Sequence, residues 1–515
     1  MSYRKDFLYT YLIQAVSKIL GLLSLFVVIP YISSNKELYG IYSVCISFAV
    51  FFGYADLGFM SACEKFVAES VIKKDVKQEI AYLGFTTFIL LVFLILVSLG
   101  LLFLSYDPSL VINGITESNI KIARLLLLFT ALSFPIYCLQ RIVNVIYSSR
   151  IKSYLYQNIQ IVGNFINIIS VLFFFSNGRY MIVEYYIFYK IVNLLVGILG
   201  LILARNIFCI SIINLAKSIR FKKDVYDRVK KLAFANLFAT VCWILYYEID
   251  QVAIAKLYDA KAVATYAIGF SVLTLFRTLF GSLYSPFTAR FNYFIGEGNH
   301  EGLKQYVLKV VNMYYPLTVF PILIVSILAA PFVMTWVGEQ YVDSTVIVSS
   351  IVFCNILAFL SYPAGQYIVA YEKNLVLTVS AAIVVVIYWG GIYLLHNIAG
   401  VECFAYMKAL GMTLSGIYAT IVVQKMMCVD ILFFFRYIIK NHFASTVVCV
   451  LASNLLLEYA CNVKSVFNLG VNIILMGSAF CVSIAFDIFT CKDIRLFIGD
   501  IFSSLKDRIV QNTEN

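Results

Sequence analysis

Charged residues are scarce in this chain of 515 amino acids. Asp, Glu, Lys and Arg together make up 13% of it, apolar residues make up 62%, and the mean hydropathy is +0.89. A soluble globular protein carries about a quarter charged residues. The composition therefore excludes a soluble enzyme and a disordered chain. The net charge of +11 is explained first by membrane topology, so nucleic acid is not expected as a partner.

The motifs of common catalytic and metal sites are missing too. The sequence has no GxxxxGK[ST], GxSxG or HExxH pattern and no dinucleotide-binding fingerprint. Its 12 cysteines show no CxxC spacing and lie mostly in apolar runs, which indicates packing residues rather than disulfides or zinc ligands. The three histidines, His300, His396 and His442, are far apart and fall in predicted loops or at span ends. No metal, no cofactor and no enzymatic activity are expected.

Long apolar runs fill the sequence instead. A transmembrane helix needs about 20 mostly apolar residues, and hydropathy predicts 14 spans, the first of them uncleaved because it is too long for a signal-peptide core. The approximate ranges are 7–32, 38–59, 81–105, 121–147, 154–176, 180–204, 232–255, 262–288, 310–335, 345–368, 374–395, 402–424, 441–460 and 468–490. The predicted fold is an all-α integral membrane protein.

The distribution of Lys and Arg fixes the expected orientation. With the N-terminus in the cytoplasm, the tails and loops on that side hold 27 of the 39 basic residues, the opposite loops hold 6, and the remaining 6 lie inside spans. Cytoplasmic loops carry the excess of basic residues in membrane proteins. The asymmetry supports 14 helices with both termini in the cytoplasm.

A basic polar stretch divides the chain into parts. It predicts an N-terminal six-helix lobe at 1–204, a basic cytoplasmic linker at 205–231, and a C-terminal six-helix lobe at 232–427. The last part, 428–515, holds spans 13 and 14 and an amphipathic tail expected on the inner membrane surface. Two six-helix halves are typical of transporters built from repeated bundles.

Six basic residues lie within the predicted spans. An Arg or Lys at the bilayer centre costs about 2.5–3.5 kcal/mol on insertion scales, so these side chains are expected to face protein or water, or to reach the interface. They are Lys18, Arg277, Lys190, Lys408, Arg124 and Arg141. For Lys18 and Arg277 the alternative to a cavity role is a structural ion pair. Arg124 and Arg141 lie near span ends, where snorkelling to the interface is the alternative.

Polar side chains recur at helical spacing beside these cations. On span seven the series is Asn236, Thr240, Trp243, Tyr247 and Asp250, and on span five it is Gln157, Gln160, Asn164 and Asn167. Such stripes predict a shared wet cavity, and interhelical hydrogen bonding is the alternative. Combined polar and aromatic groups suit sugars, with Trp243 and Tyr247 as the aromatic candidates. Three acids, Asp56, Glu248 and Asp250, are expected either to pair with cations at the packed lobes or to bind a coupling ion.

Three ordered stretches resemble the polysaccharide-export branch of the multidrug/oligosaccharidyl-lipid/polysaccharide flippase superfamily. They run from Ile29-Pro30-Tyr31-Ile32 to Leu38-Tyr39-Gly40-Ile41-Tyr42, from Tyr54-Ala55-Asp56-Leu57-Gly58-Phe59 to Glu64-Lys65-Phe66-Val67-Ala68, and from Asp250-Gln251-Val252-Ala253-Ile254-Ala255 to Ala262-Val263-Ala264-Thr265-Tyr266. Lys65 stands where the family more often has Arg, and Ala264 where it more often has Gly.

The resemblance implies two lobes in a V-shaped arrangement that work by alternating access. It implies a flippase that moves undecaprenyl-pyrophosphate-linked oligosaccharide, an O-antigen or capsule repeat unit, from the cytoplasmic to the outer leaflet of the bacterial inner membrane. The cations above would neutralise the pyrophosphate in a cationic cavity, while the polyprenyl tail stays among the membrane lipids. A polysaccharide polymerase and a chain-length regulator are expected as partners in polysaccharide or lipopolysaccharide biosynthesis.

Two other functions stay open from the sequence. An ion-coupled multidrug exporter of the same superfamily would need cation-binding acids in the cavity, whereas this chain is rich in embedded cations. A membrane glycan polymerase is disfavoured because the predicted outer loops are short, the longest being 106–120.

Overall fold

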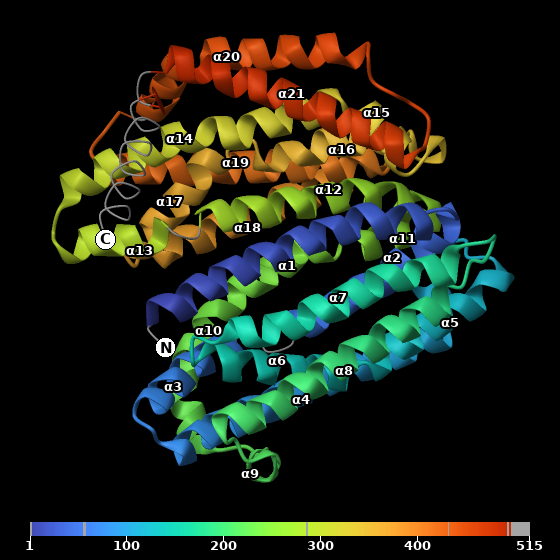
Figure 1. Cartoon of the computed structure of the whole chain (residues 1–515), viewed down its shortest axis with the longest axis vertical. Coiled ribbons are helices and arrows are strands. Elements are labelled where there is room, and N and C mark those ends of the chain that lie inside the picture. The colour runs from blue at the N-terminus through green and yellow to red at the C-terminus, as the bar shows by residue number, and fades with distance from the viewer. Residues whose placement is uncertain (1–2, 55–57, 285–286, 431, 492–493, 496–515) are drawn as a thin grey trace, which may run out of the picture. The chain divides into compact units, whose positions relative to one another are not determined.

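The computed structural model describes residues 3–54, 58–284, 287–430, 432–491 and 494–495, and these residues form helices joined by short turns (Figure 1). Throughout this described part there is no β-strand, which confirms the predicted all-α class. The chain forms two compact units, Met1–Ala267 and Ile268–Asn515. Asp56 and nearly all of the predicted amphipathic tail lie outside the described residues.

The N-terminal unit is a bundle of long helices with shorter ones at its ends. Helix α1 packs on α7, α7 and α6 pack on α8, and α4 packs on α5. The helices are α1 (Tyr3–Ile32), α2 (Lys36–Tyr54), α3 (Phe59–Ile72), α4 (Val76–Tyr106), α5 (Glu117–Leu132), α6 (Phe134–Ser148), α7 (Ser153–Phe175), α8 (Ile182–Phe208), α9 (Ile212–Lys217), α10 (Lys223–Trp243), α11 (Asp250–Leu257) and the start of α12 (Ala260–Tyr284). Short turns η1 (Pro108–Leu110) and η2 (Ile244–Glu248) lie between them.

The C-terminal unit pairs α18 with α19 and α20 with α21, and α14 packs against both α20 and α21. Its helices after α12 are α13 (Phe287–Gly296), α14 (His300–Ile327), α15 (Ala329–Trp336), α16 (Ser344–Val352), α17 (Ala358–Ala370), α18 (Asn374–Ala399), α19 (Glu402–Met426), α20 (Phe433–Leu457) and α21 (Val466–Thr490), with short turns η3 (Glu339–Tyr341) and η4 (Phe353–Asn355). One apolar core cluster joins α13, α14, α17, α19 and α20, and a smaller one joins α14, α20 and α21.

Thirteen segments of the described chain are helical, long and apolar enough to cross a membrane. Each overlaps a predicted span. The predicted seventh span, 232–255, is absent from that set because it is built from α10, η2 and α11, and because α10 opens with charged residues. A fourteenth crossing therefore stays a prediction. The predicted division of the chain into four parts also stays a prediction. In the structure, α10 and α11 pack on α2, α3 and α4 of the N-terminal unit.

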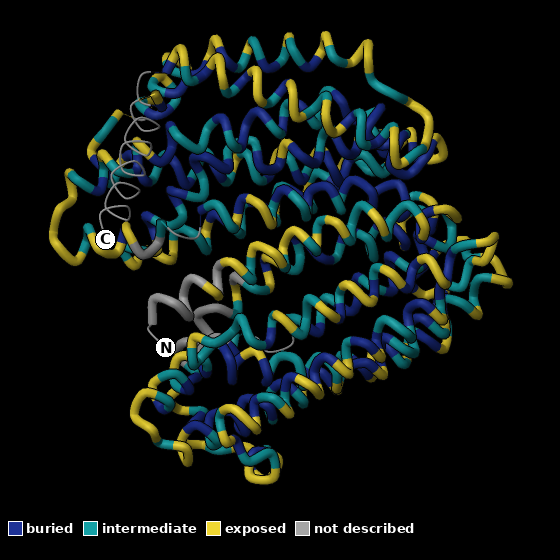
Figure 2. The backbone as a smooth tube through the Cα atoms, in the orientation of Figure 1, coloured by how far each residue is buried: buried dark blue, intermediate teal, exposed yellow. Residues whose placement is uncertain are grey.

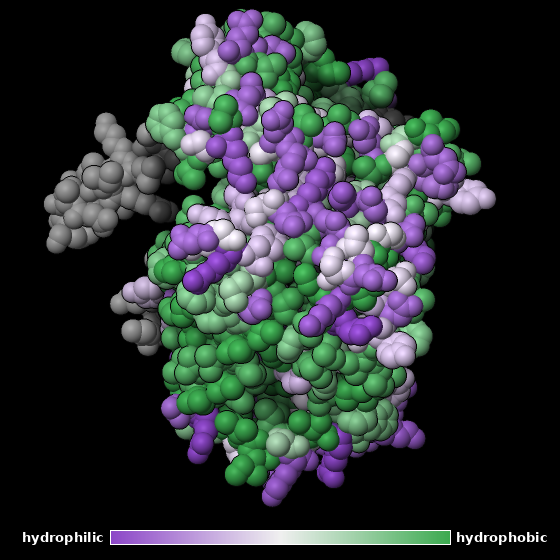
Figure 3. Space-filling view, turned by 90° about the vertical axis from the view of Figure 1, so that its right-hand side faces the viewer, coloured by the Kyte–Doolittle hydropathy of each residue, from purple (hydrophilic) through white to green (hydrophobic). Residues whose placement is uncertain are grey.

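The outer faces of the long helices are apolar and exposed. In α1 none of the most apolar window is buried within the protein, and in α18 and α21 only 22% of it is. Figure 2 shows exposed residues along the outer side of α20 and α21, with buried residues on their inner side. Figure 3 shows wide areas of hydrophobic surface. Apolar area of this extent is stable in contact with lipid and not with water.

Candidate functional site

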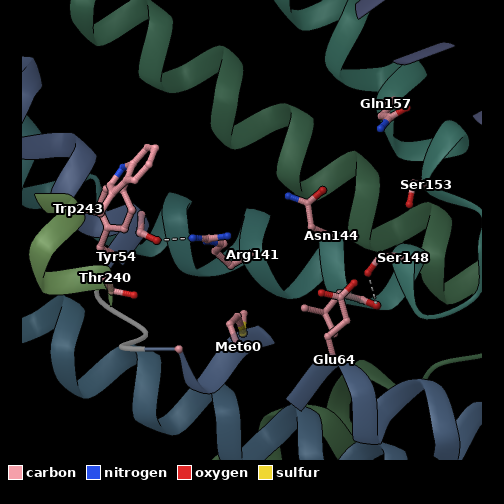
Figure 4. Close-up of a pocket in the computed structure, with 13 residues that line it drawn as sticks. Tyr54, Met60, Glu64, Arg141, Asn144, Ser148, Ser153, Gln157, Thr240 and Trp243 are labelled. Carbon is pink, nitrogen blue, oxygen red and sulfur yellow. Dashed lines mark hydrogen bonds between the residues drawn. The ribbon is translucent and has the colours of Figure 1, made fainter. Parts of the chain in front are cut away.

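A cavity of about 650 Å³ lies inside the N-terminal unit. Its wall is made by the end of α2, the start of α3, the second half of α6, the start of α7 and the end of α10 (Figure 4). The lining residues are Gly53, Tyr54, Gly58, Met60, Glu64, Arg141, Asn144, Val145, Ser148, Ser153, Gln157, Thr240 and Trp243. The volume is that of a small-molecule site. On the predicted topology the α6–α7 turn is cytoplasmic, so the cavity lies toward that side.

Among the described lining residues, Arg141 carries the positive charge and Glu64 a carboxylate. In Figure 4 the arginine lies between Trp243 and Tyr54 on one side and Asn144 on the other. Its guanidinium donates a hydrogen bond to the backbone carbonyl of Gly53, at the end of α2. A carbonyl is a neutral partner, so this contact orients the arginine without cancelling its charge. A guanidinium held in this way can bind a phosphate or carboxylate through its other N–H groups.

An aromatic group with its own hydrogen bonds closes one side of the cavity. The indole Nε1 of Trp243 donates to the hydroxyl of Tyr54 at 2.8 Å, and that hydroxyl donates to Oε1 of Glu248 at 3.0 Å. The rings of Trp243 and Tyr247 lie 4.3 Å apart. Tyr247 and Glu248 belong to η2, which is a π-helical turn, a feature that often occurs at functional sites. An indole face beside amides and hydroxyls is suited to a sugar ring.

The predicted acids on this segment are bound to tyrosines. Glu248 is 7% exposed and accepts from Tyr54, and Asp250 is 1% exposed and accepts from the hydroxyl of Tyr266. Neither acid lines the cavity. Whether they also bind a coupling ion stays a prediction. Within the described residues, no group of three or more His, Cys, Asp or Glu could hold a metal ion.

Two of the predicted lysines lie inside the helix bundles. Lys190 on α8 is 8% exposed, and its ammonium donates to the hydroxyl of Tyr137 at 3.0 Å. It lies 4.7–5.9 Å from the ring centres of Tyr137, Tyr186 and Tyr189. Cation–π contacts of this kind stabilise an ammonium away from water.

Lys408 on α19 belongs to the C-terminal unit. It is fully buried, and its ammonium lies 4.8 Å from the Tyr388 ring and 5.9 Å from the Phe270 ring. Neither Lys190 nor Lys408 lines the cavity that contains Arg141.

The other three predicted cations also lie elsewhere. Lys18 is on the exposed side of α1, and Arg124 is exposed on α5, where it donates to the carbonyl of Tyr106 at 3.1 Å. Arg277 is partly buried on α12, in the C-terminal unit. Of the six predicted cations, all of them described, the structure brings Arg141 alone to this cavity. Of the two predicted aromatic residues, Trp243 lines it and Tyr247 packs against the indole.

Sequence reasoning missed most of the α6 wall. Arg141, Asn144 and Ser148 follow one another at spacings of three and four, which places them on one helix face. That spacing was available from the sequence. The polar stripe of α7 is divided between two cavities, because Gln157 lines the large one and Asn164 lines a smaller one together with Gln160.

A second buried polar cluster, in the C-terminal unit, corrects the placement of His442. The sequence placed this histidine at a span end, but α20 begins at Phe433, so His442 lies inside the helix and is fully buried. Its Nδ1 is hydrogen bonded to Asp487 of α21 at 2.8 Å, and its Nε2 to Oδ1 of Asn312 of α14 at 2.7 Å. Ser445 also donates to Asp487. The cluster joins three helices and was not expected from the sequence.

The fold is that of the multidrug and lipid-flippase transporters. The lipid II flippase MurJ, in an inward closed conformation, superposes with a TM-score of 0.69 at 15% identity, over 93% of this chain and 98% of that one. A multidrug resistance MATE family transporter in an inward-facing conformation superposes with a TM-score of 0.61 at 12% identity, over 83% and 95% of the two chains. At these identities the likeness shows the fold alone.

Sequence comparison gives the family. The model of the family described as "Polysaccharide biosynthesis protein" matches residues 3–289, more than half of the chain, so the chain belongs to this family. It is also 28% identical over 127 residues to the uncharacterized membrane protein EpsK of Bacillus subtilis (strain 168). That match spans 24% of this chain and about a quarter (25%) of the length of EpsK. Family and fold together define a polysaccharide biosynthesis protein with the fold of the multidrug and lipid-flippase transporters.

Proposed function

We propose that this protein moves undecaprenyl-pyrophosphate-linked oligosaccharide, an O-antigen or capsule repeat unit, from the cytoplasmic to the outer leaflet of the bacterial inner membrane. The observation that carries the proposal is the chemistry of the Arg141 cavity. The guanidinium of Arg141, with a neutral partner, lines the same cavity as an indole face, amides, hydroxyls and the carboxylate of Glu64. The guanidinium of such a lining can bind a pyrophosphate. Its amides and hydroxyls can hydrogen bond to sugar hydroxyls, and the indole face can pack against a sugar ring.

A flippase cavity also has to exclude the carrier tail. A pyrophosphate cannot enter hydrocarbon without a large cost in free energy, whereas a polyprenyl chain is stable there. The exposed apolar faces of the long helices leave the tail in lipid, and the head group alone needs the polar interior. Alternating access is part of the proposal, since MATE transporters of this fold are described in inward-facing and outward-facing conformations.

The proposal keeps the other predicted substrate contacts, Lys18, Arg277, Lys190, Lys408 and Arg124, for other stages of the transport cycle. None of them lines the Arg141 cavity. The partners we propose are the lipid-linked substrate, a polysaccharide polymerase and a chain-length regulator. Both termini are proposed to be cytoplasmic.

The test is Arg141→Gln in cells that lack the native gene copy. Loss of the guanidinium removes the charge for the pyrophosphate, and we expect surface polysaccharide to fall about tenfold or more, as for the loss of a charged hydrogen-bond partner worth about 1.5–3 kcal/mol. Arg179→Gln, on the exposed turn between α7 and α8, is the matched control. The amount of each variant in the membrane is measured alongside.

The outcomes separate the competing functions. Normal polysaccharide with Arg141→Gln at normal membrane levels contradicts the proposal. Drug sensitivity of the deletion strain with intact polysaccharide identifies a multidrug exporter instead. Accumulation of unpolymerised lipid-linked units on the outer leaflet identifies a polymerase.

A further inference from the structure

A second cavity lies in the N-terminal unit, between α1, α6, α7 and α8. Its volume is about 190 Å³, which exceeds the roughly 30 Å³ share of one water molecule several times. The lining residues are Ser17, Gln140, Gln160, Gly163, Asn164, Asn193 and Val196. Five of these seven carry an amide or a hydroxyl and none carries a charge. The cavity is therefore polar and neutral.

The amides of this cavity are only partly used by the protein. Gln140 donates through Nε2 to the backbone carbonyl of Asn193 at 3.1 Å and to its Oδ1 at 3.4 Å, and Asn193 donates through Nδ2 to the carbonyl of Tyr189 at 2.9 Å. These bonds orient the two side chains. An amide has two donor hydrogens and an oxygen that accepts two bonds, so both side chains retain hydrogen-bonding capacity.

The same face of α7 carries buried polar atoms that lack a hydrogen-bond partner among the described residues. They are Oε1 of Gln157 and both amide atoms of Asn167, whose side chain is only 5% exposed. Buried polar groups in proteins are nearly always hydrogen bonded, because leaving them unpaired costs free energy. These two amides flank Gln160 and Asn164, which line the second cavity, so α7 carries hydrogen-bonding groups on both sides of it that the described protein does not pair.

The two cavities have neighbouring lining residues on α7 and α6. Gln157 lines the Arg141 cavity and Gln160, three residues later on the same face, lines the smaller one. Three residues of helix correspond to about 4.5 Å. On α6 the two cavities are lined by adjacent residues, Arg141 and Gln140. The two cavities therefore lie next to each other along these two helices.

The lining selects the chemistry of the occupant. Phosphate is disfavoured because Lys190, a buried cation one turn from Asn193, directs its ammonium to Tyr137 and the neighbouring rings. A metal cation is disfavoured because the lining has no carboxylate. A hydroxyl both donates and accepts, as an amide does, so a neutral ring with several hydroxyls matches this wall.

We propose that the amide-lined cavity is a sugar subsite, which holds one monosaccharide ring of the translocated head group while its anionic end is at Arg141. The proposal rests on the proposed function, and it assigns sugar contact to Ser17, Gln140, Gln160, Asn164 and Asn193. Gly163 allows α7 and α8 to pack closely beside the site. A Cβ at this position would lie 2.5 Å from Cγ2 of Val196, which is too short for a van der Waals contact.

The direct test measures access and occupancy on the purified full-length protein. Ser17→Cys changes one atom of the lining, and its reaction with a small methanethiosulfonate reagent is followed by peptide mass spectrometry. Ala15→Cys, on the exposed side of the same helix, is the matched control. We expect glucose, galactose or N-acetylglucosamine to slow labelling at position 17 several-fold and not at position 15, with glycine betaine at equal osmolality as the reference. Labelling that no sugar slows, or a thiol at position 17 that does not react, overturns the subsite.

The cellular test separates the subsite from the function itself. Asn164→Leu keeps the approximate size of the side chain and removes its hydrogen bonds, and Asn158→Leu makes the same change on an exposed position of α7. We expect Asn164→Leu to lower surface polysaccharide several-fold at normal membrane levels and Asn158→Leu to leave it unchanged. If Arg141→Gln abolishes polysaccharide and Asn164→Leu does not, the flippase stands and the subsite is wrong. If neither variant has an effect, the proposed function fails as well.

Discussion

Two buried polar regions of the molecule, the polar face of α7 in the N-terminal unit and the His442 cluster in the C-terminal unit, use their hydrogen-bonding groups differently. In the N-terminal unit, amides line cavities and several amide atoms of α7 lack a hydrogen-bond partner among the described residues. In the C-terminal unit, His442, Asp487, Asn312 and Ser445 are at most 1% exposed and are hydrogen bonded to one another. The first arrangement leaves binding capacity for a ligand, and the second uses that capacity to hold α14, α20 and α21 together. Burial of polar residues therefore does not by itself identify a transport site.

Of the substitutions that test this contrast, Asp487→Asn should lower the stability of the protein most. The substitution leaves His442 buried without its carboxylate, and breaking a buried pair destabilises a protein by about 3–5 kcal/mol. We expect a large fall in the thermal unfolding temperature in detergent. Asp430→Asn is the control, because Asp430 forms a 3.3 Å ion pair with Arg436 on an exposed surface of the same unit, and such pairs contribute about 0–1 kcal/mol. Equal losses in the two variants would contradict a structural role for the buried cluster.

Two identical substitutions, one in each unit, test the contrast directly. Asn312→Leu removes the partner of the His442 ring, and leaving a buried group unpaired costs about 1–3 kcal/mol. Asn167→Leu removes an amide that has no partner in the described protein, so we expect unchanged or raised stability without substrate. The measurement is the unfolding temperature of both variants in the same detergent. If Asn167→Leu destabilises as much as Asn312→Leu does, the contrast between the α7 face and the His442 cluster is wrong.

A weaker effect is expected at the aromatic wall of the Arg141 cavity. Tyr54→Phe keeps the ring and removes the hydroxyl that links Trp243 to Glu248. We expect a loss of about 1 kcal/mol in stability, the typical net value of a hydrogen bond, together with a lower rate of transport because the indole loses its orientation. Val241→Ala, exposed on α10 near Trp243, controls for loss of side-chain volume. A change in transport without the expected loss of stability would assign the Tyr54 hydroxyl to the substrate instead.

Most of the fold followed from the sequence because membrane helices are long apolar runs. The thirteen confirmed segments each contain such a run, and hydropathy alone located them. The seventh predicted span differed because its geometry depends on a π-helical turn at Ile244–Glu248, which hydropathy does not detect. A helix that contains a π-helical turn can have the same average hydropathy as a regular α-helix, so hydropathy does not distinguish the two.

The site was less predictable, because position along a helix does not fix which face meets a cavity. Arg141 was found as an embedded cation, yet the same argument also selected Lys190 and Lys408, which lie among aromatic rings. The polar stripe of α7 was a better guide, since side-chain spacing of three and four carries information about one face. His442 was misplaced because the predicted span began at 441 whereas α20 begins at Phe433, and its partners, Asp487 and Asn312, are distant in sequence.

Helix α2 approaches the start of α12 at Gly40, where a Cβ would lie 1.7 Å from the carbonyl oxygen of Ala260. No rotation of a side chain relieves that overlap, because the obstacle is main chain. Any larger amino acid at position 40 has to push the two segments apart, and even alanine is excluded. We therefore expect glycine at position 40 in natural variants of this chain, while neighbouring positions vary. Saturation mutagenesis of position 40 should yield functional protein only from glycine codons.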